Sequence, residues 1–325
     1  MLIDQIPHHQ LAGFLRLLSS SNKISPASLT KELDLTHAET SDIIKNFLKL
    51  ENFLIEKEKT LCCISPLELL DSSKIEEEVN LLNQQNKNIF YAHHIVSEST
   101  NTVAATLLNH SESNILVSSD FQTKGKGQRG KHWIANPGSS LLFSVGLKAI
   151  KKEYFHRNLS LCIGVIVHKY LTAIGASNLY LKWPNDIYYG EKKLCGILVE
   201  NSFYKDTNNC VIGIGINKHP FKLGQEQVAG INDLSVGCLS SEKIVSDLTK
   251  EIITLSSKNE WTSFAGLCGY FNRYDFLKNK TIQITTGSEK TQGKAIGVNE
   301  EGELLLLSEG AEKKLTSGSV DIIPI

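Results

Sequence analysis

A short segment rich in glycine and cationic residues limits the folds open to this chain more than any other feature. Its sequence is FQTKGKGQRGKHW, residues 121–133. Glycine lets backbone amides approach a ligand closely, and cationic side chains attract phosphate oxygens. The segment interleaves both residue types: Lys124, Gly125, Lys126, Gly127, Arg129, Gly130 and Lys131. We therefore expect a site for an anionic ligand here; the alternative is a solvated basic loop without a ligand.

The spacing of these three glycines also matches the dinucleotide fingerprint, which needs a strand before the glycines and a helix after them. Residues 114–119 are suitable for the strand. Asn136, Pro137 and Gly138 follow the segment, and the apolar run at residues 140–147 is typical of a second strand. We therefore exclude a nicotinamide or flavin site and predict a loop between two strands.

Length and composition limit the class of protein. A chain of 325 residues favours two or three domains, and a net charge of -1 excludes binding of a polyanion along the whole surface. Seven cysteines without a C-x-x-C pair favour reduced thiols over a zinc ribbon or a disulfide framework. The start of the chain does not resemble a secretory signal, and no apolar run approaches about 18 residues. We expect a cytoplasmic protein without a membrane partner.

The first 66 residues predict a winged helix-turn-helix domain. Apolar residues at Leu11, Phe14, Leu15 and Leu18 have helical spacing, a second helix begins near Pro26, and a third follows the capping residue Thr36. Two short strands then form a hairpin. This order of elements is typical of a winged helix.

The charge of this domain argues against strong DNA binding by a monomer. Residues 1–70 carry seven Lys/Arg and nine acidic residues, whereas phosphate neutralisation supplies much of DNA affinity. A dimer is required for useful affinity, and a role as a protein-interaction module is the alternative. Contacts to DNA are expected at Ser25, Thr36, His37, Thr40, Ser41 and Lys45.

The rest of the chain predicts an α+β fold. Residues 67–89 form a connecting helix and linker, and residues 90–275 alternate strands, hairpins and helices as in a mixed-sheet domain. Residues 276–325 have the rhythm of strands and turns that is typical of a small β-barrel.

Five short motifs occur in order along the central region: STN at residues 99–101, QTKGKGQRGKHW at 122–133, KWPND at 182–186, KKLCGILVE at 192–200 and GIGIN at 213–217. Together they resemble the biotin protein ligases. The full layout is similar to the bifunctional type, a ligase that also represses the biotin operon, with a biotin/lipoate ligase-like catalytic domain and a C-terminal SH3-like barrel.

The resemblance implies a reaction in two steps. Biotin and ATP, with Mg²⁺, form biotinyl-5'-AMP, and a lysine of the biotin carboxyl carrier protein of acetyl-CoA carboxylase then accepts the biotin. It also implies a homodimer that forms on ligand binding, and operator DNA as a partner. A lipoate ligase and a ligand sensor without catalytic activity are the rival interpretations.

Site residues follow from the same resemblance. The catalytic residues are Lys193, Arg129 and Lys126. Biotin is held by Ser99, Thr100, Asn101, Gln122, Gly125, Lys126, Gly127, Gln128, Lys193 and Gly196. ATP and the adenylate are held by Arg129, Lys131, Trp133, Lys182, Asn185, Asp186 and Asn217, with Asp186 also as the Mg²⁺ ligand.

The residue types suit this chemistry independently. Joining a carboxylate to an α-phosphate brings two anions together, so cations must neutralise the transition state, and Lys193 is the principal candidate. The neutral Gln128 departs from the enterobacterial pattern, which has arginine there. Because glutamine cannot grip a phosphate as an arginine fork does, we expect Arg129 or Lys131 to take that role, or the adenylate to be held less tightly.

Overall fold

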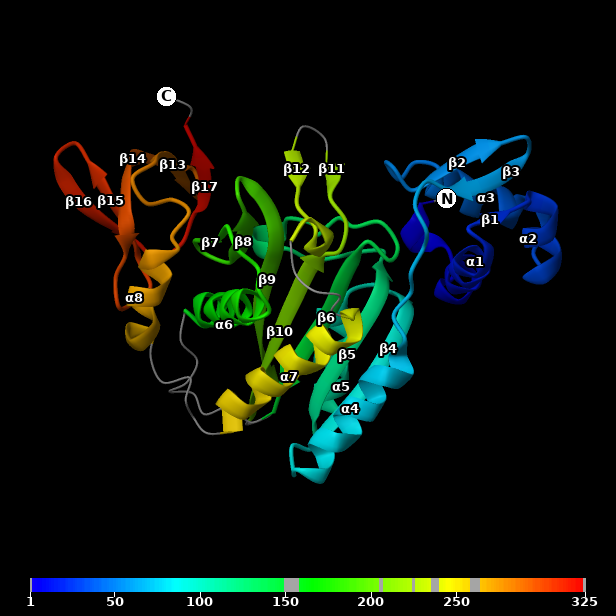
Figure 1. The fold of residues 1–325 in the computed structure, drawn as a ribbon, viewed down its shortest axis with the longest axis horizontal. Coiled ribbons are helices and arrows are strands. Elements are labelled where there is room, and N and C mark those ends of the chain that lie inside the picture. The colour runs from blue at the N-terminus through cyan, green and yellow to red at the C-terminus, as the bar shows by residue number, and fades with distance from the viewer. Residues whose placement is uncertain are drawn as a thin grey trace.

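The computed structural model describes residues 2–148, 158–204, 207–223, 226–234, 240–257 and 264–323. Three β-sheets follow one another along the chain, and the N-terminal and C-terminal units flank a large central sheet (Figure 1). Within the described ranges, no helix has the length and apolar character needed to cross a bilayer.

The N-terminal unit packs three helices against a small sheet. The helices are α1 (His8–Ser21), α2 (Pro26–Glu32) and α3 (His37–Phe47), and the strands β1 (Lys23–Ile24), β2 (Leu54–Lys57) and β3 (Thr60–Cys63) pair in the order β1-β3-β2. Phe14 and Phe47 meet in the core with ring centroids 4.7 Å apart. The predicted cap of α3 is confirmed, because Thr36 Oγ1 accepts the Glu39 amide at 3.2 Å.

The central sheet has nine strands. Its main path is β11-β12-β9-β10-β6-β5-β4, and β7 and β8 extend it from β9. Strand β4 runs parallel to β5, whereas each neighbouring pair in the series β5, β6, β10 and β9 is antiparallel. The strands are β4 (Ile89–Ser97), β5 (Asn114–Gln122), β6 (Ser140–Leu147), β7 (Leu179–Lys182), β8 (Asp186–Tyr189), β9 (Lys192–Tyr204), β10 (Thr207–Asn217), β11 (Phe221–Leu223) and β12 (Glu226–Val228).

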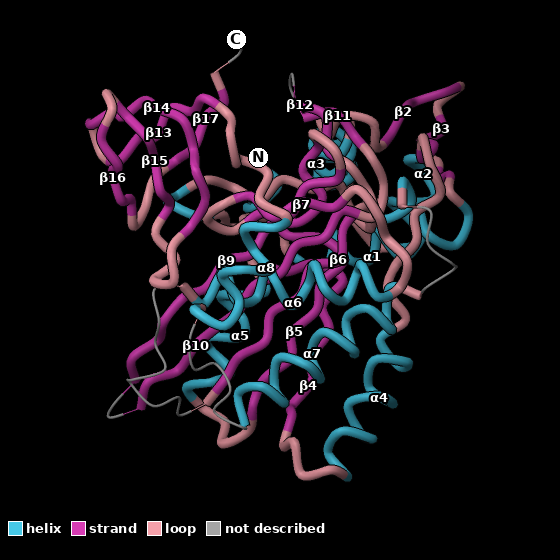
Figure 2. The backbone as a smooth tube through the Cα atoms, turned by 60° about the vertical axis from the view of Figure 1, so that its left-hand side comes forward, coloured by secondary structure: helices cyan, strands magenta, loops and turns pink. Residues whose placement is uncertain are grey.

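Helices cover both faces of this sheet (Figure 2). Helix α5 (Thr100–Asn109) packs Ala104 and Leu108 against Ile115, Val117 and Val211 on one face. The other face is covered by α4 (Ser72–Gln84), α6 (Leu159–Ala173) and α7 (Ser241–Ser257), which share the main hydrophobic core. The rejection of a dinucleotide fold is confirmed, since a short 3-10 helix (Gln128–Gly130) and then β6 follow the glycines.

Helix α4 confirms the predicted helix between the N-terminal unit and the sheet. It does more than connect them, because Ile75, Val79 and Leu82 are buried in the main core beside α7. The segment before it is held by side chains of the central unit: Asp120 Oδ1 accepts the Leu70 amide at 2.8 Å.

The C-terminal unit is a five-stranded antiparallel sheet in the order β16-β15-β14-β13-β17, preceded by α8 (Ala265–Arg273). Over residues 264–323 no pairing joins its two end strands, so this sheet is an open path. Trp183 Nε1 donates to the Gly302 carbonyl at 3.0 Å and ties the unit to the end of β7. Its strands are β13 (Thr281–Thr286), β14 (Glu289–Val298), β15 (Leu304–Ser308), β16 (Ala311–Leu315) and β17 (Ser319–Ile322).

Candidate active site

A pocket of about 190 Å³ opens where the glycine-rich loop (residues 121–133) faces the strands β9 and β10. All five sequence motifs contribute to its lining. The predicted residues that line it are Ser99, Thr100, Asn101, Gln122, Lys126, Gly127, Gln128, Arg129, Lys131, Trp133, Lys182, Asn185, Asp186, Lys193 and Gly196. Two predicted residues, Gly125 and Asn217, are not part of this lining.

The start of α5 forms one wall. Ser99 is the N-cap residue of α5, and its side chain makes no capping hydrogen bond. Gln122, at the end of β5, accepts the Thr100 amide at 2.7 Å through Oε1. A helix terminus with free amides is suited to a polar ligand, and Gln122 fixes the first of these amides.

Asn101 is buried behind this wall and is 3% exposed. Its Nδ2 donates to Glu200 Oε2 at 2.7 Å, and its Oδ1 lies 2.6 Å from Ser144 Oγ. A side chain at Gly213 would place Cβ 2.1 Å from Asn101 Oδ1, so the first glycine of GIGIN is needed for space.

Lys193 reaches the pocket because of a β-bulge. The pairing of β8 with β9 shifts between Ile187 and Tyr188, which leaves Leu194 without a partner on β8. Lys193 and Gly196 would lie on opposite faces of a regular strand, but a Cβ at Gly196 would lie 3.3 Å from Lys193 Cε. The extra residue therefore turns Lys193 from the core face to the pocket face.

The lysine ammonium is held by a carboxylate in the pocket wall. Lys193 Nζ lies 2.7 Å from Asp186 Oδ1 and 5.4 Å from the centroid of the Trp133 ring. Its backbone is fixed as well, because its carbonyl accepts the Ala229 amide at 2.9 Å and Asn217 Nδ2 at 3.3 Å. Asn217 is 2% exposed and thus acts on the backbone of Lys193 in this structure.

Two glycines provide a flat floor for the indole of Trp133. A Cβ at Gly196 or Gly215 would lie 2.6 or 2.7 Å from the ring. Both residues belong to predicted motifs, and neither spacing nor composition alone indicated which side chain lies over them. Asn185 forms the neighbouring edge, where its Nδ2 donates to the Ile197 carbonyl at 2.8 Å.

The cations of the glycine-rich loop are directed to different partners. Lys126 Nζ lies 3.6 Å from Glu200 Oε1, and Lys131 Nζ donates to Ser319 Oγ at 3.2 Å. Lys124 points away from the pocket to Glu98, with Nζ 2.7 Å from Oε1, and this contact raises the pKa of Lys124 and lowers that of Glu98. Lys124 is therefore occupied outside the site.

The C-terminal unit contributes part of the lining that the sequence did not predict. Gly318, Ser319 and Val320 border the pocket, and Arg129 Nη1 donates to the Thr285 carbonyl at 3.4 Å. Thr285 lies 68 residues beyond the end of the last motif, and Gly318 lies 101 residues beyond it. Only the packing of the two units brings them to the pocket.

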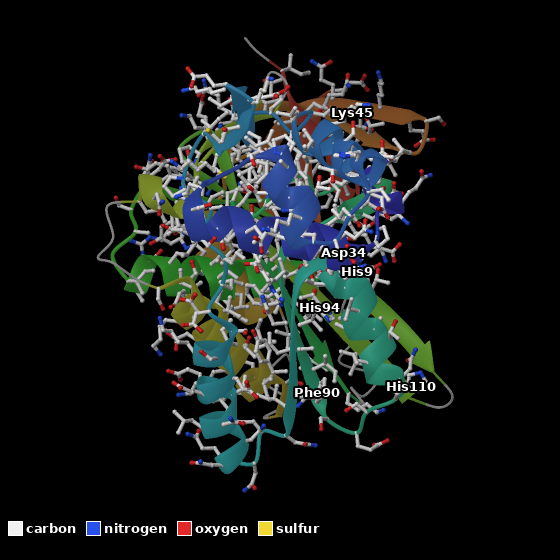
Figure 3. The ribbon with its side chains drawn as sticks, turned by 90° about the vertical axis from the view of Figure 1, so that its right-hand side faces the viewer. His9, Asp34, Lys45, Phe90, His94 and His110 are labelled. Carbon is white, nitrogen blue, oxygen red and sulfur yellow. The ribbon has the colours of Figure 1, made fainter. Side chains whose placement is uncertain are left out.

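The remaining predicted site, on the N-terminal unit, is only partly accessible. Thr40 is 3% exposed and lies 2.9 Å from Thr30 Oγ1, so the prediction that Thr40 contacts DNA is wrong. His37 and Lys45 are exposed on α3, and Lys45 lies on the outer face of the unit (Figure 3). Ser25 caps α2 by accepting the Ser28 amide at 3.0 Å.

A metal cage does not form in the described part of the chain, where no three His, Cys, Asp or Glu side chains gather with suitable geometry. Asp186 is the one predicted metal ligand, and its Oδ1 is paired with Lys193. A single carboxylate in a pocket suits Mg²⁺ that arrives with phosphates, because Mg²⁺ keeps several other oxygen ligands.

Comparison with known proteins gives two matched segments. A sequence model of the Biotin/lipoate A/B protein ligase family matches residues 94–217, and one of the Biotin protein ligase C terminal domain matches residues 279–322. Together these segments span just over half of the chain.

Relatives of similar length agree. The bifunctional ligase/repressor BirA of Escherichia coli is 28% identical over 240 residues, which cover 70% of this chain and 72% of that protein. BirA of Salmonella typhimurium is 27% identical over 263 residues, or 79% of each chain. The biotin protein ligase from Aquifex aeolicus in complex with biotin and ATP has a TM-score of 0.58 at 25% identity, covering 73% of this chain and 99% of that one.

The fold, the pocket and the matched segments thus define a member of the biotin and lipoate protein ligase class. The C-terminal match and the named relatives distinguish between the biotin and the lipoate branches of this class. The chain belongs to the biotin protein ligase family.

Proposed function

We propose that this protein couples biotin to ATP, forms biotinyl-5'-AMP and pyrophosphate, and transfers the biotin to a lysine of the biotin carboxyl carrier protein of acetyl-CoA carboxylase. The observation that carries this proposal is the convergence of Lys193, the glycine-rich loop and the start of α5 on one pocket. The match to a biotin protein ligase C-terminal domain favours biotin over lipoate.

In this proposal each wall has its own task. Thr100, Asn101 and Gln122, with Ser99, hold the bicyclic head of biotin, whose N–H and C=O groups need matched partners. Lys193 exchanges its contact with Asp186 for the biotin carboxylate and the α-phosphate, where negative charge develops.

Closure of the glycine-rich loop then excludes water from the adenylate, which would otherwise hydrolyse. Lys126, Arg129 and Lys131 bring positive charge to the phosphates, and Trp133 shelters the adenine. Mg²⁺ bound through Asp186 and the phosphates would neutralise charge on ATP. Removal of Mg²⁺ with a chelator should therefore stop adenylate formation.

The activity test is direct. Purified full-length protein, ATP, Mg²⁺ and biotin should biotinylate a carrier-protein domain, and exchange of pyrophosphate into ATP should depend on biotin and not respond to lipoate. A protein that exchanges pyrophosphate with lipoate only would be a lipoate ligase. A protein that binds biotin without exchange or transfer would be a sensor without catalytic activity.

A second role in repression is supported by the N-terminal unit. We propose that residues 1–66 form a winged helix-turn-helix that binds operator DNA as a homodimer, through Ser25, Thr36, His37, Ser41 and Lys45. The order of α1, α2, α3 and the β2–β3 hairpin supports it. A mobility shift on a biotin-operon promoter that requires biotinyl-adenylate is expected, and no shift at any concentration would leave an interaction module.

The remaining assignments are part of the same proposal. Residues 67–89 connect the units, residues 90–275 form the catalytic domain, and residues 276–325 form an SH3-like domain. The proposed location is the cytoplasm, where the substrate carrier and ATP are available. Limited proteolysis followed by mass spectrometry tests the boundaries, because cleavage should concentrate near residues 66 and 275 and spare α4, which is packed into the main core.

A further inference from the structure

A chain of polar groups runs behind the α5 wall of the pocket and ends at Glu200, a motif residue for which the sequence predicted no role. Glu200 lies on β9, on the same face as Gly196. From Glu200 Oε2 the chain passes to Asn101 Nδ2 at 2.7 Å, from Asn101 Oδ1 to Ser144 Oγ at 2.6 Å, and from Ser144 Oγ to Thr100 Oγ1 at 2.7 Å. Ser144 is fully buried, whereas Thr100 lines the pocket.

The charge at one end determines where the hydrogen atoms lie. An ionised carboxylate only accepts hydrogen bonds, so the Asn101 amide must direct Nδ2 toward Glu200 and Oδ1 toward Ser144. An amide oxygen also only accepts, and therefore the single hydroxyl hydrogen of Ser144 is donated to Asn101. The short contact between Ser144 and Thr100 then requires the hydroxyl hydrogen of Thr100.

The direction of the chain determines what the Thr100 hydroxyl can offer to a ligand in the pocket. With its hydrogen directed to Ser144, the Thr100 hydroxyl presents only lone pairs to a ligand. Gln122 Oε1 also lies 3.2 Å from the Thr100 hydroxyl, but Ser144 Oγ is the nearer acceptor at 2.7 Å and has no hydrogen left to donate. In either contact the hydroxyl hydrogen of Thr100 is already used within the protein. A hydroxyl that can only accept selects a ligand with an N–H group at this point, which suits the cyclic urea of biotin.

We infer that Glu200 is a positioning residue that sets the direction of this hydrogen-bond chain and so makes Thr100 an acceptor for an N–H of the biotin head. The inference rests on the proposed function, because it concerns how biotin is bound. Glu200 does not touch the ligand; it acts through Asn101 and Ser144.

Glu200 has a second partner, which offers a competing explanation. Its Oε1 lies 3.6 Å from Lys126 Nζ, and both side chains are more than 40% exposed at that contact. An exposed ion pair contributes little to binding, whereas a directed buried hydrogen bond is costly to lose. The two routes can be separated because Ser144 belongs to one and Lys126 to the other.

The test measures the dissociation constant for biotin by titration calorimetry on the full-length protein without ATP. Glu200→Gln keeps the shape but can donate or accept, so the chain loses its fixed direction. We expect it to weaken biotin binding about tenfold, with KM for biotin raised and KM for ATP unchanged in pyrophosphate exchange. Glu112→Gln removes the same charge from a side chain that is 95% exposed, and should bind as the wild type does.

Double variants identify the route. Ser144→Ala should also weaken binding about tenfold, and adding it to Glu200→Gln should cost little more, because both break one chain. By contrast, the fold-increases in the dissociation constant for biotin caused by Glu200→Gln and by Lys126→Gln should multiply in the double variant, because Lys126 is not part of the hydrogen-bond chain. The inference would be overturned if Glu200→Gln bound biotin as tightly as the wild type. It would also be overturned if the fold-losses of affinity from Glu200→Gln and Ser144→Ala multiplied in the double variant. If Glu200→Gln fails to fold, Ser144→Ala alone decides, since unchanged affinity there also overturns it. Absence of biotin binding by the wild type would instead refute the proposed function.

Discussion

The two sides of the pocket are built in opposite ways. On the α5 side, Asn101 and Ser144 are buried and their polar atoms are paired with other protein groups. On the loop side, Lys126, Arg129 and Lys131 are exposed and rest on weak contacts 3.2–3.6 Å long. The buried side is organised before the ligand arrives, whereas the loop cations can leave their partners for an anion. In the proposed function, recognition of the neutral biotin head and neutralisation of charge on the phosphates are therefore separated in space.

The largest effect should come from the residue between the two sides. Lys193→Ala removes the cation that faces the developing charge, and we expect the rate of biotin-dependent pyrophosphate exchange to fall at least 10²-fold. Biotin affinity without ATP should fall much less. Lys192→Ala is the matched control, since Lys192 is exposed at the start of β9 and should retain wild-type exchange. A Lys193→Ala enzyme within tenfold of the wild type would contradict the separation of tasks.

Gly213→Ala should disrupt the organised side. Its Cβ would lie 2.1 Å from Asn101 Oδ1, and the Asn101 side chain is held by Glu200 and Ser144. We expect the free energy of unfolding to fall by about 1–3 kcal/mol, with a larger loss of biotin affinity than of ATP affinity. Gly266→Ala in α8 has open space around it and should not destabilise the protein. Equal losses for both ligands would indicate that the wall does not distinguish them.

A buried carboxyl group outside both sides of the pocket offers a test of the scaffold that holds them. Burial raises the pKa of Asp275, next to Leu181 of β7, to about 6. Because the folded state holds this proton more tightly than the unfolded state, the free energy of unfolding should decline as pH rises from about 4 to 6. Asp275→Asn should therefore be more stable than the wild type at pH 8, by on the order of 2 kcal/mol, and closer to it at pH 5. Denaturant titrations at both pH values measure this, and an equal difference at both would argue against it.

The smallest effect concerns the loop. Gln128→Arg adds a fork that can grip the adenylate phosphate, so release of the intermediate should slow about fivefold, or ~1 kcal/mol. Gln128→Glu should accelerate release through repulsion. The rate at which labelled adenylate leaves the enzyme in a chase experiment is the measurement. Identical rates for all three proteins would remove position 128 from the account.

Local patterns predicted much of the fold and the site. The strand before the glycine-rich loop, the absence of a helix after it, and the helices α1 and α3 follow from local residue patterns. The bulge at Leu194 was not predictable, because it depends on how β8 aligns with β9. Helices α7 and α8 lie in a stretch without motifs, where no local pattern predicted a helix.

Long-range packing explains the other omissions. Ser319 reaches the pocket from the last strand, and nothing near it in the sequence indicates a ligand. Asn217 was predicted from its motif to face the adenylate, whereas its amide holds the Lys193 carbonyl. Thr40 was predicted as a DNA contact from its place in α3, but the register of that helix buries it. Each of these depends on a neighbouring element that local sequence does not reveal.

A crystal structure with a stable analogue of biotinyl-5'-AMP would test the central claim most directly. We expect Lys193 Nζ to leave Asp186 and to lie about 3 Å from both the acyl oxygen and a phosphate oxygen, with the glycine-rich loop closed over the ligand. A structure in which Lys193 remains on Asp186, or points to solvent while the ligand occupies the pocket, would contradict it.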